Sequence, residues 1–236
     1  MWLKGKIVYL AKAFADFLFP PICLACNQEI PAGLVCDRCL HQINRSTLGV
    51  CARCGFPLGL QESCQHCKIK LSLPRTRALG FYSHPLLPLI HAFKYQGKKS
   101  LAKIFGKALT GLINSDPILK QADGLVPIPL HPARLRERGF NQAELLGIEI
   151  AKLTGIPLIN ALRRQRNTKS QTKLAITERI SNMQGAFGVQ DASVIYQKKV
   201  ILIDDVITTG ATLASAAKTL FENGVSGVFG LVIARA

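Results

Sequence analysis

The apolar positions of the chain fall into short continuous runs that alternate with longer amphipathic stretches. The runs lie at residues 124–129, 157–162, 200–203 and 227–234, and residues 76–83 are expected to supply a first strand. Helical periodicity lies between them, most clearly over residues 141–153 and 213–223. Apolar runs between helices predict parallel strands buried on both faces. We therefore expect an α/β fold in which helices flank a parallel sheet.

The first segment departs from this alternation. Residues 1–19 carry apolar side chains at helical spacing, interrupted by Lys4, Lys12 and Asp16. We expect an amphipathic helix that packs against the rest of the chain, or alternatively docks on a membrane or a partner. The segment is too broken to span a bilayer and lacks the uninterrupted apolar core of a signal peptide, so a cytoplasmic protein is expected.

Residues 163–187 form a second departure, a long polar and basic stretch with few core residues. The stretch predicts a hood over a binding site or a loop that orders on ligand binding, with an inert surface excursion as the alternative. Six of its cations are candidates to close on an anion such as DNA: Arg163, Arg164, Arg166, Lys169, Lys173 and Arg179.

Composition adds a strong positive charge to this picture. The chain has 236 residues, 48% of them hydrophobic, a formal net charge of +16 and a pI near 9.8. This balance favours a polyanionic partner, namely nucleic acid, pyrophosphate or an anionic membrane surface. Charge alone does not choose among the three.

Two more basic segments are candidates for phosphate contacts. Residues 86–114 contain Phe93, Tyr95, no acid and five lysines, which are Lys94, Lys98, Lys99, Lys103 and Lys107. Lysines beside aromatic rings suit single-stranded DNA, although a solvated basic helix face with its rings in the core fits equally well. Arg134, Arg136 and Arg138 follow the run at 124–129, and we expect them on a loop that binds a pyrophosphate or nucleic-acid phosphate.

All eight cysteines form C-x-x-C pairs, and the second four repeat the spacing of the first four: Cys23, Cys26, Cys36, Cys39, Cys51, Cys54, Cys64 and Cys67. Each half has the spacing of a four-thiolate zinc site, so two structural zinc ions are expected. Disulfides are the alternative, disfavoured in a reducing cytoplasm. Consecutive pairing would give two ribbons and alternating pairing a cross-braced fold, while His41 and His66 could replace a thiolate.

The chemistry centres on residues 199–213, where an apolar strand ends in Asp204 and Asp205 and a Thr-Thr-Gly-x-Thr loop leads into a helix. Loop N–H groups, hydroxyls and the helix dipole together suit a phosphate. The acids lie at the carboxyl end of the strand and can accept hydrogen bonds from sugar hydroxyls. A P-loop ATPase strand is disfavoured because no G-x-x-x-x-G-K-[ST] occurs, and a plain N-capped helix needs no such pattern.

These residues resemble the signature of the type I phosphoribosyltransferases. The resemblance implies a phosphoribosyltransferase fold and binding of phosphoribosyl pyrophosphate (PRPP) together with Mg²⁺. It also implies that the acids bind the ribose hydroxyls and that the loop holds the 5′-phosphate, with the site residues Asp204, Asp205, Thr208, Thr209, Gly210, Ala211 and Thr212. The arginines at 134, 136 and 138 occupy, more loosely, the place of the pyrophosphate loop.

Over nearly its full length the chain resembles the ComF competence family, through the double C-x-x-C head, AFKYQGKKSLAKIFG, VPIPLHPARLRERGFNQAELL, RNTKSQTKL and VILIDDVITTGATL. The resemblance implies a cytoplasmic protein of natural transformation that acts on incoming single-stranded DNA, beside a helicase and the inner-membrane uptake machinery. We expect a helix at residues 1–20, zinc ribbons at 21–72 and a phosphoribosyltransferase-like domain at 73–236. A glutamine amidotransferase is not expected, because every Cys is assigned to zinc and no amidase domain precedes the ribbons.

Three functions compete at this point. The first is a DNA-handling protein with a PRPP-type pocket, and the second is an active phosphoribosyltransferase that uses a nitrogen acceptor. The third is a scaffold that senses PRPP without turnover.

Overall fold

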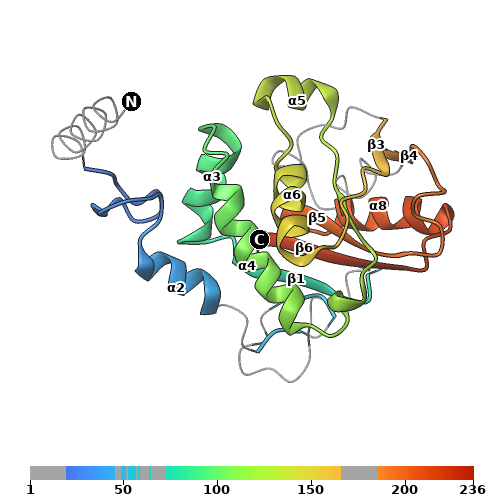
Figure 1. Ribbon diagram of the computed structural model, residues 1–236, viewed down its shortest axis with the longest axis horizontal. Helices are drawn as coiled ribbons and strands as arrows, with labels where there is room; N and C mark the ends of the chain where they lie inside the picture. Colours follow the sequence, from blue (N-terminus) through green and yellow to red (C-terminus); the bar gives the residue numbers. More distant parts are fainter. Residues whose placement is uncertain are drawn as a thin grey trace, which may run out of the picture.

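The computed structural model describes residues 20–45, 49–51, 53–56, 58, 64, 73–165 and 185–236, whose arrangement is shown in Figure 1. The predictions for residues 1–19 and for most of residues 163–187 fall outside the described residues. The same holds for His66 and Cys67 and for the candidates Arg166, Lys169, Lys173 and Arg179.

The described helices are α2 (Asp37–Arg45), α3 (Leu86–Tyr95), α4 (Leu101–Ser115), η2 (Leu119–Gln121), α5 (Pro132–Arg138), α6 (Gln142–Thr154) and α8 (Ala211–Glu222). The strands are β1 (Thr76–Phe81), β2 (Gly124–Pro127), β3 (Leu162–Arg164), β4 (Phe187–Val189), β5 (Lys199–Ile207) and β6 (Gly227–Arg235). Among these described helices, none is both long enough and apolar enough to cross a bilayer.

A parallel sheet with the strand order β1-β6-β5-β2 forms the centre of the fold. The run at residues 157–162 contributes one further parallel bridge, from Leu158 to Leu125 at the β2 edge. Its remaining apolar residues lead into β3, which pairs antiparallel with β4 outside the main sheet. The predicted parallel α/β class is therefore confirmed.

Helices cover both faces of the sheet because the strands are apolar on both sides. Ile201 and Ile203 of β5 pack into the core that α3, α4 and α6 close, whereas Val200 and Leu202 pack under α8. In Figure 1, α4 and α6 lie across one face of the sheet. At their crossing a Cβ on Gly106 would lie 2.7 Å from the Cβ of Glu149, so only glycine permits this helix spacing.

The central strand runs further than the apolar pattern predicts. Pairing between β2 and β5 stops at Pro127 and Ile203, while β5 continues beside β6 as far as Ile207 and Arg235. The two acids therefore lie inside β5, in the part that β2 no longer covers. This departure of β2 opens the carboxyl edge of the sheet beside the acids.

The cysteine-rich segment packs directly on the sheet and its helices. Cys23, Cys39 and Ile43 are buried in the same core as Leu79 and Leu89. Residues of the second half also contact the sheet. The N–H of Thr76 in β1 donates a hydrogen bond of 2.7 Å to the carbonyl of Arg53, and the guanidinium of Arg235 in β6 donates one of 2.8 Å to the carbonyl of Cys54.

Candidate functional site

A cavity of about 470 Å³ opens at the carboxyl edge of the sheet, where β5 outruns β2. Its walls come from the end of β5, the start of α8, helix α5, the start of α6, the last turn of α3 and strand β3. Ligands of open α/β sheets bind at this kind of crevice, outside the carboxyl ends of the strands. In Figure 1, α3 and α5 stand beside this edge, and Arg164 of β3 lines the cavity.

Asp204 and Asp205 form the acidic side of the cavity. The side chain of Asp204 accepts a 2.8 Å hydrogen bond from the backbone N–H of Asp205. The Nζ of Lys94 lies 2.7 Å from the Oδ1 of Asp205. The side chain of Lys94 is 15% exposed and that of Asp205 is 14% exposed. Burial, together with the charge of Asp205, raises the pKa of Asp204 to about 7. This carboxyl pair is held in a partly desolvated site with Lys94 as a direct partner of Asp205.

The Thr-Thr-Gly-x-Thr loop forms the end of the cavity beside the acids. Gly210 adopts a φ of 79° as the N-cap of α8, a left-handed conformation that residues with a side chain rarely adopt. The N-cap residue Gly210 has no side chain to accept a hydrogen bond, and Thr209 Oγ1 accepts one from the N–H of Ala211, the first residue of α8, at 3.3 Å. Thr208 and Thr212 line the cavity. The start of α8 thus presents N–H groups and hydroxyls where a phosphate could bind.

Helix α5 carries the arginines that we expected on a loop, and that expectation is wrong. The helix begins at His131, whose Nδ1 accepts from the N–H of Ala133, and at Pro132 in the first turn. It ends at Gly139, which has a φ of 73°. A proline at the start and a left-handed glycine at the end are ordinary helix signals, so this helix could have been predicted from the sequence.

The helix separates its three arginines. Arg134 and Arg138 line the cavity, whereas Arg136 is exposed and lies outside its lining. Arg164 of β3 also lines the cavity. Burial and the nearby charge of Arg134 lower the pKa of Arg164, while Asp204 acts in the opposite direction. Crowded guanidinium groups facing a carboxylate pair make a wall that an anion would stabilise.

The lysines between residues 86 and 114 divide in the same way. Lys94 points into the cavity, whereas Lys98, Lys99, Lys103 and Lys107 are exposed on the α3–α4 turn and along α4. The aromatic rings also separate, because Phe93 is fully buried and Tyr95 is 58% exposed. Arg163 is exposed and lies outside the cavity lining.

Sequence reasoning missed several polar residues of the cavity, among them Tyr82, Glu137, Asn141 and Gln142. Asn141 caps α6 through a 3.1 Å hydrogen bond from the N–H of Ala143 and also donates to the carbonyl of Ile128. Gln142 is 1% exposed and accepts from Arg138 at 3.2 Å. The Gly-Phe-Asn-Gln stretch after the arginines was the available signal for the last two, while nothing marked Tyr82.

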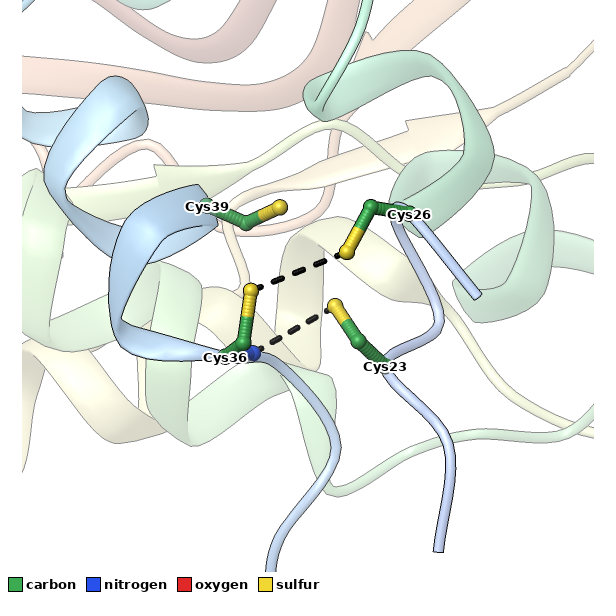
Figure 2. A group of neighbouring side chains, drawn as sticks. All are labelled: Cys23, Cys26, Cys36 and Cys39. Carbon is green, nitrogen blue, oxygen red and sulfur yellow. Dashed lines mark hydrogen bonds between the residues drawn. The ribbon is translucent and has the colours of Figure 1, made fainter. Parts of the chain in front are cut away.

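The first four cysteines come together in one cluster, shown in Figure 2. Their Sγ atoms all lie within 4.8 Å of one another, and Cys26 Sγ is 3.7 Å from Cys36 Sγ. A tetrahedral zinc with Zn–S bonds of about 2.3 Å requires S–S separations of about 3.8 Å, so the thiols fit zinc. The N–H of Cys36 also donates to Cys23 Sγ at 3.3 Å, and Asn27, next to Cys26, adopts a left-handed conformation with a φ of 59°.

The protonation of these thiols points to the same fit. Although burial opposes it, backbone N–H groups led by that of Cys36 bring the pKa of Cys23 down to about 6. Burial and the neighbouring cysteines raise the pKa of Cys39. Four thiols so close together lose all their protons only when a cation balances the charge of the thiolates, and zinc is such a cation.

A second cluster contains Cys51, Cys54 and Cys64, with the last two Sγ atoms 3.5 Å apart. The fourth cysteine of this half, Cys67, lies outside the described residues. The clusters therefore follow consecutive pairing, which fits two ribbons, and none of the described cysteines forms a disulfide. His41 is exposed on α2 and belongs to neither cluster.

Comparison with known proteins extends the similarity to nearly the whole chain. Residues 14–68 match the family model of the double zinc ribbon domain. The chain is 32% identical to competence protein F of Haemophilus influenzae over 226 residues, covering 91% of this chain and 96% of that protein. It is 28% identical to DNA utilization protein YhgH of Escherichia coli over 217 residues, covering 89% and 94%.

A solved structure is similar over part of the chain. The glutamine PRPP amidotransferase of B. subtilis, complexed with ADP and GMP, shows 19% identity and a TM-score of 0.42. The match covers 67% of this chain and 31% of that one.

Proposed function

We propose, from the premise that this chain belongs to the competence protein F family, that it handles incoming single-stranded DNA during natural transformation. Its cavity at the carboxyl edge of the sheet binds PRPP or a related phosphate. The names of two relatives, competence protein F and DNA utilization protein, support a DNA-linked role. We place the protein in the cytoplasm at the inner face of the membrane, beside a helicase and the uptake machinery.

One observation carries the pocket assignment. Acids for a sugar, an N–H and hydroxyl cradle for a phosphate, and a guanidinium wall for a pyrophosphate all line the same cavity of about 470 Å³. Asp204 and Asp205 accept hydrogen bonds from the ribose hydroxyls. The start of α8 holds the 5′-phosphate, with Thr208 and Thr212 as hydroxyl donors. Mg²⁺ enters together with the pyrophosphate.

The pyrophosphate end of the ligand contacts Arg134, Arg138 and Arg164. Guanidinium groups bind phosphate oxygens in pairs of parallel hydrogen bonds, so three of them can hold both phosphate groups in a fixed orientation. Their mutual repulsion falls when the anion binds, because it supplies the negative charge that the wall lacks.

The DNA surface is the exposed basic ridge of the α3–α4 turn and α4. Lys98, Lys99, Lys103 and Lys107 are all exposed there. Ammonium groups on one ridge can follow a phosphate backbone without reading its sequence. The ridge adjoins the cavity, because Lys94 and Tyr95 at the end of α3 line the cavity and the lysines follow them directly.

Turnover is a second candidate, favoured by the cationic wall opposite the acids. A nitrogen nucleophile would attack C1 of the ribose, the bond from C1 to the pyrophosphate oxygen would break, and Mg²⁺-pyrophosphate would leave. Such a reaction depends on positioning and on stabilising the charge of the leaving group. Pyrophosphate release from PRPP with a panel of nucleobases tests turnover, and Asp205→Asn should abolish any release.

The experiment that tests the proposed function is a titration of the purified protein with labelled single-stranded DNA over a salt series, with and without Mg²⁺-PRPP. We expect binding that weakens steeply with salt and changes when PRPP is present. Asp205→Asn should remove the PRPP effect and keep the DNA binding. Binding of PRPP without DNA binding or turnover would overturn the proposal and leave a PRPP-sensing scaffold.

A further inference from the structure

We infer that Tyr95, together with Arg138, forms a stacking subsite for an unpaired nucleobase at the mouth of the cavity. This inference rests on the proposed DNA-handling function and deepens it by naming where a base is held. Nothing in the similarity to the relatives assigns such a site.

The exposure of Tyr95 is the first observation. Its side chain is 58% exposed at the last position of α3, while Phe93, two positions earlier, is fully buried between Phe105 and Phe140. The core of α3 is therefore complete without Tyr95. A large aromatic ring that the core does not need, placed at the rim of a polar cavity, offers its surface to a ligand.

The second observation is a cation held against this ring. The guanidinium carbon of Arg138 lies 5.1 Å from the centroid of the Tyr95 ring. One nitrogen of Arg138 donates to the Tyr95 hydroxyl at 3.3 Å, and the other donates to Gln142 at 3.2 Å. Because both nitrogens are tied, the guanidinium is held over the ring, and the ring of His91 lies 5.0 Å from that of Tyr95 at an angle of 50°. The outer face of the guanidinium and the exposed part of the ring are the surfaces on which a base can stack.

The position of the ring in the chain is the third observation. Lys94, immediately before it, is paired with Asp205 inside the cavity, and exposed Lys98 and Lys99 follow it on the turn. A DNA strand whose phosphates lie on Lys98 and Lys99 therefore passes Tyr95, so one of its bases can turn onto the ring. Sequence-tolerant binders of single strands use this combination of aromatic surface and cationic track.

The charge around Tyr95 selects this ligand over an apolar one. Arg138 lies over the Tyr95 ring, and exposed Lys98 and Lys99 follow within four residues, with Lys99 Nζ 4.9 Å from the centroid of the Phe140 ring. This positive charge suits a polyanion that carries π-faces better than an apolar peptide segment. Paired bases are stacked inside a duplex and cannot reach the ring. The subsite is therefore specific for unpaired nucleic acid and tolerant of base identity.

The first test compares Tyr95→Leu with a matched exposed tyrosine, Tyr196→Leu. Tyr196 is 62% exposed just before β5, at the opposite end of the sheet from the cavity. We expect Tyr95→Leu to weaken binding of an oligo(dT) strand about tenfold, without changing the slope of log affinity against log salt. Lys99→Gln should instead lower that slope by about one. Tyr95→Trp should restore affinity, and Tyr196→Leu should leave it unchanged.

A second measurement reads the stacking directly. In a Trp2→Phe background, the tryptophan of Tyr95→Trp is the single tryptophan of the chain. We expect oligo(dT) to quench its fluorescence, whereas ribose 5-phosphate with Mg²⁺, which fills the cavity but has no base, should not. Quenching by duplex DNA as strong as by single strands would contradict the inference.

Different results would overturn the proposed DNA-handling function and the Tyr95 subsite. If the wild-type protein does not bind single-stranded DNA at low salt, the proposed function fails and the subsite with it. If the wild type binds but Tyr95→Leu, folded as judged by its melting temperature, binds equally well, only the subsite is overturned.

Discussion

Lys94 and Asp205 form an ion pair of 2.7 Å between the last turn of α3 and the end of β5. The pair joins two parts of the chain that carry different signals, a lysine-rich run and a phosphoribosyltransferase signature. It also fixes the end of α3, and with it Tyr95, beside the cavity. This one contact therefore links the proposed DNA surface to the proposed phosphate pocket.

Removing Lys94 should destabilise the fold. In Lys94→Met the carboxylate of Asp205 loses its direct partner beside Asp204, and we expect a loss of about 2 kcal/mol in the free energy of unfolding at neutral pH. Lys120→Met, on the exposed side of η2, should stay within about 0.5 kcal/mol of the wild type. A double-mutant cycle with Asp205→Asn measures the pair, and a coupling energy near zero would contradict this account.

The pKa of Asp204 predicts a pH dependence of stability. Burial and Asp205 raise this pKa from the ordinary 3.8 to about 7, so the folded protein holds the proton more tightly than the unfolded chain. The stabilising contribution is complete below pH 3.8 and is lost as the pH rises through about 7. Asp204→Asn should therefore gain stability relative to the wild type with rising pH, by roughly 2 to 4 kcal/mol above pH 7.

Asp191, whose pKa is shifted in the opposite direction, serves as the control for this experiment. Hydrogen bonds from the side chain and the N–H of Ser193 lower the pKa of Asp191. Its contribution is present at neutral pH and is lost as the pH falls, so the stability difference of Asp191→Asn should change in the opposite direction. Urea unfolding between about pH 2.5 and 8 measures both variants, with the change for Asp191→Asn expected below pH 3.8. A pH-independent difference for Asp204→Asn would exclude the predicted shift.

The arginine wall predicts a contrast between neighbours on α5. Arg134 lines the cavity and Arg136 does not, although both belong to the same short helix. We expect Arg134→Ala to weaken binding of Mg²⁺-PRPP at least about tenfold, because a charged hydrogen bond to phosphate is lost. Arg136→Ala should change it less than about twofold. Calorimetric titration measures both affinities. Equal effects would mean that lining the cavity does not determine which arginine contacts the ligand.

The cysteine clusters predict two zinc ions per chain. A thiol-reactive agent should release two equivalents of zinc from the wild type and one from Cys36→Ser, which loses a ligand of the first cluster. The melting temperature of Cys36→Ser should fall, because Cys23 and Cys39 are part of the buried core. His41→Ala should retain both ions, and loss of zinc from this variant would make His41 a ligand.

Local patterns in the sequence were enough to predict the main sheet and to bring together the residues of two candidate sites. Apolar runs predicted strands of the main sheet because strands buried on both faces admit few polar residues, although the run at 157–162 forms only one bridge to β2. The cysteine spacing predicted the clusters, and the signature at the end of β5 placed two acids beside the loop that leads into α8, because these contacts lie within a few residues. Helix α5 was missed although His131, Pro132 and Gly139 mark its ends.

Tertiary structure alone decided which cations belong to the cavity. Lys94 and Arg164 enter it, whereas Lys98, Lys99, Arg136 and Arg163 stay on the surface. All six have the same charge and stand in similarly basic stretches, so composition could not separate them. The separation arises because β2 ends before β5 does, and the opened edge collects side chains from α3, α5 and β3. Contacts between segments so distant in sequence depend on how the elements pack, which no local pattern records.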